Sequence, residues 1–525
     1  MSLNYLDLTI LAIYALVLMF IAYKVSREKK GHEKNAEDYF LASKSLPWWA
    51  VGTSLIAANI SAEQIVGMSG AGYAGGLAVA SYEWMSAITL FIVGKYFLPI
   101  FIAKGIYTMP QFLEQRYDAR VRTVMSIFWL TLYVLVNLTS IMYLGAVAVK
   151  AVTGIAMMPA MIAMAAFSFT YSIYGGMKAV AFTDVFQVTL LVVGGLLITY
   201  LGLDKIAVLH GGDGVIDGFK QLLILAPEKF DLILDPSNPN YKNLPGLSVL
   251  VGGMWIMNFS YWGFNQYITQ RTLAAKSLQE AQKGIALAAY LKLLMPVIVV
   301  LPGIAAAVLI PGLSPADRAY PEMMITILPH GLLGIVFAGL VAAVCASLAS
   351  KINSISTLFT MDIYQQIIKP DSSEQHLVFV GRIAATVAII IALVVAEPLI
   401  GKSDQAFQFI QKFTSYFTPG IVIMFLLGFF WKKATAASAL IAGISSVLLS
   451  VLFDIFLPQI PFMDRISWVF VICTVLAVLV TYLADGSDQQ KSIDLEGINF
   501  KTEPIYNIAF LCVVVVLIAF YSAWW

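Results

Sequence analysis

Long apolar segments separated by short polar ones dominate the chain. We count fourteen such segments, and each can cross a bilayer as a helix of about 20 residues. The apolar runs are continuous and do not alternate with polar residues, which argues against a membrane barrel. The pattern predicts an all-α polytopic membrane protein with about 14 transmembrane helices. The segments cover residues 5–24, 47–70, 77–102, 124–150, 156–174, 179–203, 246–270, 281–310, 331–365, 377–397, 404–430, 435–454, 464–484 and 504–525.

Composition narrows the class further. Of 525 residues, 60% are hydrophobic and 12% are charged, whereas soluble proteins carry about 25% charged residues. A soluble multidomain enzyme is excluded, and a net charge of +1 gives no general attraction to nucleic acids. The first apolar run is long and is followed by basic residues, so we expect a retained helix and no cleaved signal peptide. Cys345, Cys473 and Cys512 lie far apart inside apolar runs and predict buried thiols.

Basic residues gather in alternate loops, and this pattern predicts the orientation in the membrane. The loop after the first segment holds five basic residues, Arg27, Lys29, Lys30, Lys34 and Lys44, and the long loop 204–245 is mixed in charge. We therefore place the first loop in the cytoplasm and both termini outside. The remaining basic positions on the cytoplasmic side are Arg116, Arg120, Arg122, Lys178, Arg271, Lys276, Lys283, Lys432 and Lys433.

Two apolar segments carry polar residues where the bilayer midplane should lie. One reads Asn59-Ile-Ser-Ala-Glu-Gln64 and is followed by several glycines, and the other runs from Asn258 to Gln266. Such stretches fit either a tight helix-packing face or an unwound segment whose carbonyl groups bind an ion or solute. They fall in the first and sixth helices after the leading one, as an inverted five-plus-five repeat requires.

The chain divides accordingly. We expect a leading helix and cytoplasmic loop at 1–46, a first repeat at 47–203 and a second repeat at 246–430. The loop 204–245 joins the repeats, and three peripheral helices follow at 431–525.

Four charged residues lie in apolar surroundings and are functional candidates because burying a charge in a membrane is costly. Glu83 and Lys292 have no easy alternative role and suggest a buried pair or one shared polar ligand. Asp184 fits either a functional acid or a solvated helix cap. Lys351 fits either a buried site or a side chain that reaches back to the cytoplasmic surface.

Uncharged donors and acceptors at similar depth are Gln64, Ser86, Asn258 and Gln411. Together with a carboxylate and an ammonium group they suit a neutral polyol, whose hydroxyls both donate and accept. Tyr261 and Trp262 can cover the apolar face of a sugar ring. No phosphate-binding loop or metal-ligand motif is present. We therefore expect no catalytic residues, no enzyme activity and no cofactor, with transport driven by an ion gradient or by none.

At these residues the sequence resembles the solute:sodium symporter family and, within it, the sodium/glucose transporters. The resemblance covers nearly the whole chain. It is densest in Asn59-Ile-Ser-Ala-Glu-Gln64, Ala80-Ser-Tyr-Glu83-Trp-Met-Ser86, Tyr174-Gly-Gly-Met-Lys-Ala179, Tyr261-Trp-Gly-Phe-Asn-Gln-Tyr267, Arg271-Thr-Leu-Ala-Ala-Lys276, Asn353-Ser354, Thr360-Met-Asp-Ile-Tyr364 and Gly428-Phe-Phe-Trp-Lys-Lys433.

The resemblance implies a leucine-transporter-type fold and assigns roles by position. It places the sugar contacts at Gln64, Glu83, Ser86, Asn258, Lys292 and Gln411. It places the inner gate at Tyr261 beside Trp262, and the outer gate at Met68, Tyr82 and Phe407. It implies sodium ligands at Ala57, Ile60, Ala343 and Ser347, and an ion exit path past Asp184 and Asn59.

One departure puts the ion site in doubt. The family usually offers two adjacent serines where this chain has Ala346-Ser347, and Lys351 nearby adds a positive charge. The sequence favours sodium-coupled symport of a galactose- or glucose-like monosaccharide. The alternatives are a proton-coupled or uncoupled sugar transporter, a sodium symporter for another polyol such as myo-inositol or another substrate class, and a sugar sensor. The resemblance also suggests a bacterial inner membrane and a monomer that suffices for transport, with sugar, sodium and lipid as partners and no nucleic acid.

Overall fold

The computed structural model describes residues 3–26, 44–106, 108–174, 177–484 and 486–525. The predicted cytoplasmic loop 27–43 and Gly175-Gly176 of one family-like motif lie outside this part of the chain. Helices account for nearly all of its regular structure, as the sequence predicts. The first half contains α1 (Tyr5–Ser26), α3 (Trp48–Asn59), α4 (Met68–Gly75), α5 (Ser81–Ile92), α6 (Leu98–Ala103), α7 (Met109–Arg116), α8 (Ala119–Thr131), α9 (Thr139–Thr153), α10 (Met157–Tyr174), α11 (Met177–Leu209) and α12 (Gly214–Leu225).

The second half continues the same architecture. It contains α13 (Leu247–Val251), α14 (Gly253–Asn258), α15 (Gln266–Leu273), α16 (Leu278–Ile298), α17 (Val300–Leu309), α18 (Ala319–Ile327), α19 (Leu332–Thr357), α20 (Glu374–Ile400), α21 (Ala406–Thr414), α22 (Thr418–Phe430), α23 (Ala436–Phe456), α24 (Phe462–Ala484) and α25 (Pro504–Ala523).

Helical structure falls on every predicted apolar segment. Among the described residues, nine helices are long and apolar enough to cross a membrane, or ten if the bent pair α21–α22 forms one span. The count of fourteen is therefore not confirmed and stays a prediction. Several of the predicted spans are interrupted, so their separate pieces are short.

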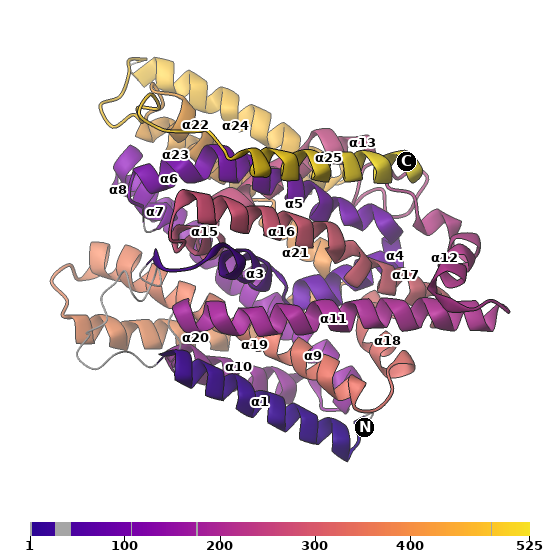
Figure 1. Cartoon of the computed structure of the whole chain (residues 1–525). Coiled ribbons are helices and arrows are strands. Elements are labelled where there is room, and N and C mark those ends of the chain that lie inside the picture. Colours follow the sequence, from indigo (N-terminus) through magenta and orange to yellow (C-terminus); the bar gives the residue numbers. More distant parts are fainter. Residues whose placement is uncertain (1–2, 27–43, 107, 175–176, 485) are drawn as a thin grey trace.

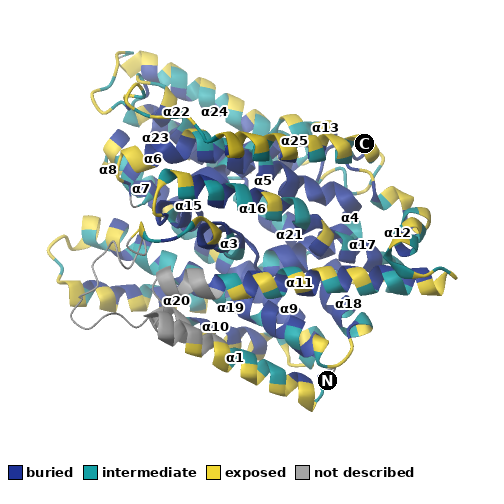
Figure 2. Ribbon diagram, viewed as in Figure 1, coloured by how far each residue is buried: buried dark blue, intermediate teal, exposed yellow. Residues whose placement is uncertain are grey.

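The helices run roughly side by side, and both termini lie at the end of the bundle that carries α12 (Figure 1). The most deeply buried helices lie in the middle, whereas α1, α20, α24 and α25 expose one face (Figure 2). The helix α3 packs against α16, α11 and α15, so it contacts elements more than 100 residues away in the sequence. The polar interruptions therefore lie inside protein, where a membrane protein can tolerate them.

Both predicted interruptions are confirmed. The helix α3 ends at Asn59, where Ile60 adopts an extended conformation (φ −71°, ψ 99°). The chain then resumes as the wide helical turn η2 (Glu63–Gly67), followed by α4. The sixth core helix breaks after α14 into η7 (Phe259–Gly263), and extended backbone at Asn265 leads into α15. Helix ends leave backbone groups without intrahelical partners, and these groups become available for ligands.

Glycine permits the close packing around α4 and the turn that follows it. A Cβ atom at Gly303 of α17 would lie 2.1 Å from the carbonyl oxygen of Ser69 on α4. At Gly76, where φ is +74°, a Cβ atom would lie 2.3 Å from the carbonyl oxygen of Lys229. Side chains at either position would force these elements apart.

The leading helix is fastened to α19 by a buried acid that the sequence reasoning missed. Asp7 is fully buried, and its Oδ1 accepts hydrogen bonds from the N–H groups of Gly331 (2.6 Å) and Gly334 (3.0 Å). Its Oδ2 lies 3.0 Å from Nδ1 of His330. Asp7 thus satisfies orphan donors at the start of α19, and α1 is fastened to the N-terminal end of that helix.

Candidate functional site

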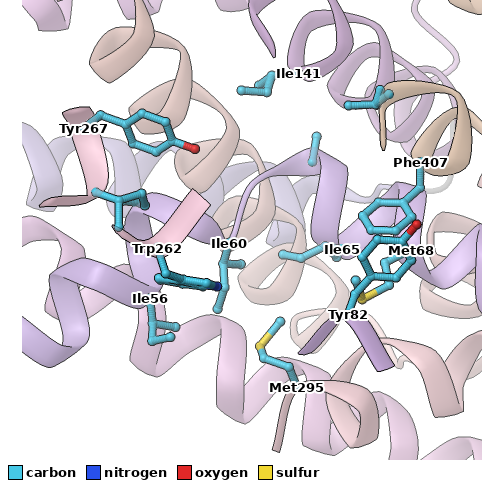
Figure 3. Close-up of a cluster of buried hydrophobic side chains, with 14 of the residues drawn as sticks. Ile56, Ile60, Ile65, Met68, Tyr82, Ile141, Trp262, Tyr267, Met295 and Phe407 are labelled. Carbon is cyan, nitrogen blue, oxygen red and sulfur yellow. The ribbon is translucent and has the colours of Figure 1, made fainter. Parts of the chain in front are cut away.

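A polar cavity lies between the two broken helices. All six predicted sugar contacts line it, although they come from η2, α5, α14, α16 and α21. Four of the five predicted gate residues line it too, and Met68 is fully buried beside it. Figure 3 shows Trp262 and Tyr267 at one side of the helix-one break, and Tyr82, Phe407 and Met68 at the other.

A charge pair forms the centre of the cavity. The Nζ atom of Lys292 on α16 donates to Oε2 of Glu83 on α5 and to Oδ1 of Asn59 at the end of α3. The Lys292 and Glu83 side chains are 1% and 2% exposed. The Nζ atom also lies 5.0 Å from the centre of the Trp262 ring, a cation–π distance. The predicted pairing of Glu83 with Lys292 is therefore confirmed.

The uncharged polar residues divide into a bonded pair and two open amides. Ser86 Oγ donates to Asn258 Oδ1 across 2.6 Å, and Asn258 Nδ2 donates to the Met254 carbonyl across 3.1 Å. Gln64 and Gln411 line the same cavity and make no side-chain hydrogen bond within the described ranges. The cavity is therefore lined by two amides, a carboxylate and an ammonium group. This set suits a ligand that both donates and accepts hydrogen bonds.

The predicted outer gate forms a compact aromatic contact. The Tyr82 and Phe407 rings meet edge to face at 5.0 Å between centroids, and both side chains are buried. The Tyr82 hydroxyl donates to Oε1 of Gln408 across 3.1 Å. This contact joins α5 to α21 at one end of the cavity.

A buried acid outside the spans braces the same end. Asp317 lies in a short turn, η8 (Ala316–Arg318), and its Oδ2 accepts from the Ala406 N–H across 3.0 Å at the start of α21. Its Oδ1 has no hydrogen-bond partner in the structure. A Cβ atom at Gly70 of α4 would lie 2.7 Å from this acid. Burial raises the pKa of Asp317 to about 8, the Ala406 N–H opposes the rise, and nearby Asp404 adds to it.

Asp317 predicts a pH dependence of stability. Because its pKa is raised in the folded state, the folded protein holds this proton between about pH 4 and pH 8, and stability falls as pH rises through that window. From pH 7 to pH 9 we expect a loss on the order of 1 kcal/mol, measured as a lower thermal midpoint in detergent. Asp317→Asn should remove this decline. An equal decline in the variant would contradict the assignment.

The inner side of the cavity contains a hydrogen-bonded chain of side chains. Asn59 Nδ2 donates to the hydroxyl of Tyr261 across 3.0 Å. The Tyr267 hydroxyl donates to the same oxygen across 2.7 Å, and Tyr133 OH donates to Asn265 Oδ1 across 2.7 Å. Asn59, expected on the ion exit path, thus lies between Lys292 and the predicted inner gate. Asn265 and Tyr267 belong to stretches quoted from the sequence but were given no role there, and Tyr133 was not singled out.

Asp184 is buried and joined to the first and sixth core helices. Its Oδ2 accepts from Ser54 Oγ across 2.7 Å and lies 3.8 Å from Nη2 of Arg271 on α15. Arg271 Nε donates to the same Ser54 hydroxyl across 3.0 Å. The reading of Asp184 as a solvated cap is therefore wrong, because its carboxylate is paired inside the protein. Arg271 was noted as a loop charge and as part of a family-like motif, but not as the partner of Asp184, which is far away in sequence.

The predicted cation ligands lie at the end of α3 and on α19, two helices that contact each other. Ala57 and Ile60 flank the end of α3, whose last carbonyls lack intrahelical partners. Ala343 and Ser347 lie one turn apart on α19, which packs on α3. The Ser347 Oγ atom is buried and has no hydrogen-bond partner in the structure. Carbonyl and hydroxyl oxygens are suitable ligands for a small hard cation, so the donor set fits sodium as a transported ion.

Ala346 borders an apolar cavity of about 620 Å³ between α1, α9, α10 and α19. Ala338, Ala342 and Cys345 line the same cavity, so this face of α19 is apolar. Ala343, Ser347 and Lys351 follow a four-residue spacing and lie on the neighbouring face. Where the resemblance implies a serine, position 346 carries a side chain that suits its apolar surroundings.

Lys351 does not reach the cytoplasmic surface. Its side chain is buried, and Nζ lies 3.0 Å from the centre of the Tyr267 ring and 5.2 Å from that of Tyr133. The interpretation of Lys351 as a surface-seeking lysine is therefore wrong. The rings of Tyr267 on α15 and Tyr133 on η5 (Leu132–Leu138) form cation–π contacts with its ammonium group inside the protein.

Comparisons with known proteins agree with this geometry. The model of the "Sodium:solute symporter family" matches residues 39–445. A sodium/glucose cotransporter of Vibrio parahaemolyticus is 50% identical, with 100% of this chain and 99% of that protein covered. A sodium/myo-inositol cotransporter 2 of Sus scrofa is 32% identical over 86% of this chain and 71% of its own length.

Solved structures show the fold. A Na+-coupled sialic acid symporter, captured in a substrate-bound outward-open state, superposes with a TM-score of 0.78 at 23% identity, covering 93% of this chain and 99% of that one. A transporter of the nucleobase-cation-symport-1 family superposes with a TM-score of 0.51 at 14% identity, covering 87% and 98%. The all-α fold is therefore of the leucine-transporter type, as the resemblance implied.

Proposed function

The chain belongs to the sodium:solute symporter family, and on that premise we propose that it carries a glucose- or galactose-like monosaccharide into the cell together with sodium. It is a multi-pass membrane transporter and not an enzyme. The observation that carries the proposal is the convergence of six polar side chains, predicted separately along the sequence, on one cavity.

The cavity has the chemistry that a neutral sugar requires. Gln64 and Gln411 offer open amides, and Ser86 with Asn258 offers a hydroxyl and an amide that already exchange one hydrogen bond. Glu83 and Lys292 neutralise each other and can each form strong, charge-assisted hydrogen bonds to hydroxyl groups. A sugar that enters therefore replaces internal contacts with its own. A carboxylate substrate would meet Glu83, which disfavours it.

Sodium would act where α3 ends. Ligation by the Ala57, Ile60 and Ala343 carbonyls and the Ser347 hydroxyl would join the first and eighth core helices. This joining favours the state in which the sugar cavity faces outward. Tyr82 and Phe407, which already meet at one end of the cavity, would close it over the sugar, and both ligands would leave inward past Tyr261. Coupling arises because each ligand favours the same state, and this coupling is reciprocal.

The proposal extends to topology and assembly. The repeats would cover 47–203 and 246–430, with the leading helix, the loop 204–245 and the last 95 residues outside them. We place the protein in a bacterial inner membrane with both termini outside, in line with the basic residues of its loops. A monomer contains the complete cavity and would suffice for transport.

Sodium-driven uptake tests the proposal directly. We expect proteoliposomes containing the purified protein to accumulate labelled galactose or glucose at least about fivefold faster under an inward sodium gradient than in sodium-free buffer. Sodium should lower the apparent dissociation constant of the sugar, because positive coupling of 1–3 kcal/mol is common.

The alternatives give different outcomes. Equal uptake with and without sodium would be compatible with the proposed sugar site but not with sodium coupling. Transport would then be driven by a proton gradient or would be uncoupled. A proton gradient imposed without sodium separates these two cases. Labelled myo-inositol in parallel tests the polyol alternative, which the 32% identical myo-inositol cotransporter supports more weakly than the 50% identical relative supports glucose.

A further inference from the structure

A lysine on the eighth core helix reaches the inner gate from the ion-site side. Lys351 lies on α19 one turn beyond Ser347 and two turns beyond Ala343, on the same face. Its Nζ has no hydrogen-bond partner in the structure and sits over the Tyr267 ring at 3.0 Å. The contact is therefore electrostatic attraction between an ammonium group and the face of a ring.

The ring that binds Lys351 belongs to the chain of hydrogen bonds beneath the sugar cavity. The Tyr267 hydroxyl donates to the hydroxyl of Tyr261 across 2.7 Å, and Asn59 donates to the same hydroxyl across 3.0 Å. Asn59 in turn accepts from Lys292. One continuous path thus runs from Glu83 and Lys292 through the predicted inner gate to α19.

The ring contact joins two elements that are far apart in the sequence. Tyr267 lies on α15, directly after the break in the sixth core helix. Lys351 therefore joins α19 to this broken helix through the Tyr267 ring. A bound sodium ion would join the first and eighth helices at neighbouring atoms.

We propose that Lys351 is a positioning residue of the inner gate, whose ammonium group holds the Tyr267 ring so that Tyr261 stays beneath the sugar cavity when the sodium site is empty. The proposal rests on the proposed function for the meaning of the gate. It accounts for the costly burial of a lysine beside a cation site: a tethered charge partly replaces the joining effect of sodium.

The accessibility of a cysteine in the cavity to a reagent from the inner side measures this positioning in the absence of sugar. Ser260 is buried, lines the cavity beside Tyr261 and can be replaced by cysteine in a background whose three native cysteines are changed to alanine. In sodium-free proteoliposomes we expect Lys351→Met to raise the rate of maleimide labelling of Ser260→Cys from the inner side about fivefold or more. Saturating sodium should return the rate to within twofold of the Lys351 parent.

The same variant should bind sodium more tightly. Removing a positive charge close to the ion site lowers electrostatic repulsion, so we expect the sodium concentration for half-maximal protection to fall about threefold or more. Lys351→Arg retains a charge that stacks on aromatic rings and should keep both values near those of the parent. Lys369→Met makes the same change at an exposed position beyond the end of the same helical run and serves as the matched control.

The outcomes separate the proposal from its alternatives. Unchanged labelling and unchanged sodium protection in a well-folded Lys351→Met protein would overturn it and leave the lysine a packing role only. If that variant fails to fold, Tyr267→Phe keeps the ring under Lys351 but removes the bond to Tyr261. Labelling at the parent rate in Tyr267→Phe would also overturn the proposal. Failure of sugar uptake in the parent would instead remove the proposed function, while labelling still tests the gate.

Discussion

Lys292→Met is expected to reduce sodium-driven sugar uptake at limiting sugar by at least about 100-fold. The ammonium group of Lys292 is buried and bonded to Glu83 and Asn59. Methionine has a similar length but leaves the Glu83 carboxylate buried without a counter-charge. Breaking a buried pair in this way costs about 3–5 kcal/mol, and each 1.4 kcal/mol corresponds to about tenfold in an equilibrium constant. Uptake of labelled sugar into proteoliposomes measures the effect.

A double variant separates lost binding from lost stability. Glu83→Gln combined with Lys292→Met removes both charges and should restore much of the thermal midpoint in detergent, because a neutral replacement of a buried pair is often tolerated. Sugar uptake should stay low in the double variant, since the charge-assisted bonds to the sugar are gone. Uptake within threefold of the parent protein in the single variant would remove Lys292 from the binding site.

The cavity residues could be predicted because burying each of these polar side chains at membrane depth costs free energy by itself. Glu83, Lys292 and Asn258 stand in long apolar runs, and a polar group at membrane depth needs a partner or a ligand. The sequence therefore pointed to these positions before any contact was known, and the interruptions at Asn59 and Asn258 showed which helices would break. The pairing of Glu83 with Lys292 followed from their opposite charges and similar depth.

Partners supplied by distant segments were not predictable. Asp184 looked like a helix cap because Arg271 and Ser54, which pair with it, lie 87 and 130 residues away along the chain. Lys351 looked able to reach the surface because the rings of Tyr267 and Tyr133, which receive its charge, come from other helices. A single sequence without aligned relatives shows that a group is polar and buried, but not which neighbour satisfies it.

The sugar cavity and the predicted ion site differ in how their polar groups are hydrogen-bonded when no ligand is bound. In the sugar cavity, Glu83, Lys292, Ser86 and Asn258 bond to one another, so an empty cavity leaves little charge exposed. At the end of α3, the Ser347 hydroxyl finds no partner in the structure. An unpartnered buried hydroxyl costs about 1–3 kcal/mol, and a cation that it ligates would remove this cost. The sugar site therefore tolerates being empty better than the ion site does.

Ser347→Ala is accordingly expected to raise the sodium concentration for half-maximal sugar uptake about 10- to 100-fold. Ser347 is the remaining hydroxyl of the usual serine pair, since position 346 is alanine. A hydrogen bond or ligand bond to a charged group contributes about 1.5–3 kcal/mol, which sets this range. Sodium titrations of uptake in proteoliposomes, with lithium or choline as the replacement cation, give the value.

Two further variants make the result specific to the ion site. Ala346→Ser should leave the half-saturating sodium concentration near that of the parent, because position 346 borders the apolar cavity and not the face of α19 that carries Ala343 and Ser347. Ser445→Ala is the matched control, since the hydroxyl of that serine already donates to the Ile441 carbonyl across 2.5 Å on α23, outside both repeats. If Ser347→Ala titrates like the parent while sugar uptake persists, the coupling ion is held by backbone carbonyls or elsewhere. The next question would then be whether the positive charge of Lys351 replaces a coupling cation in transport.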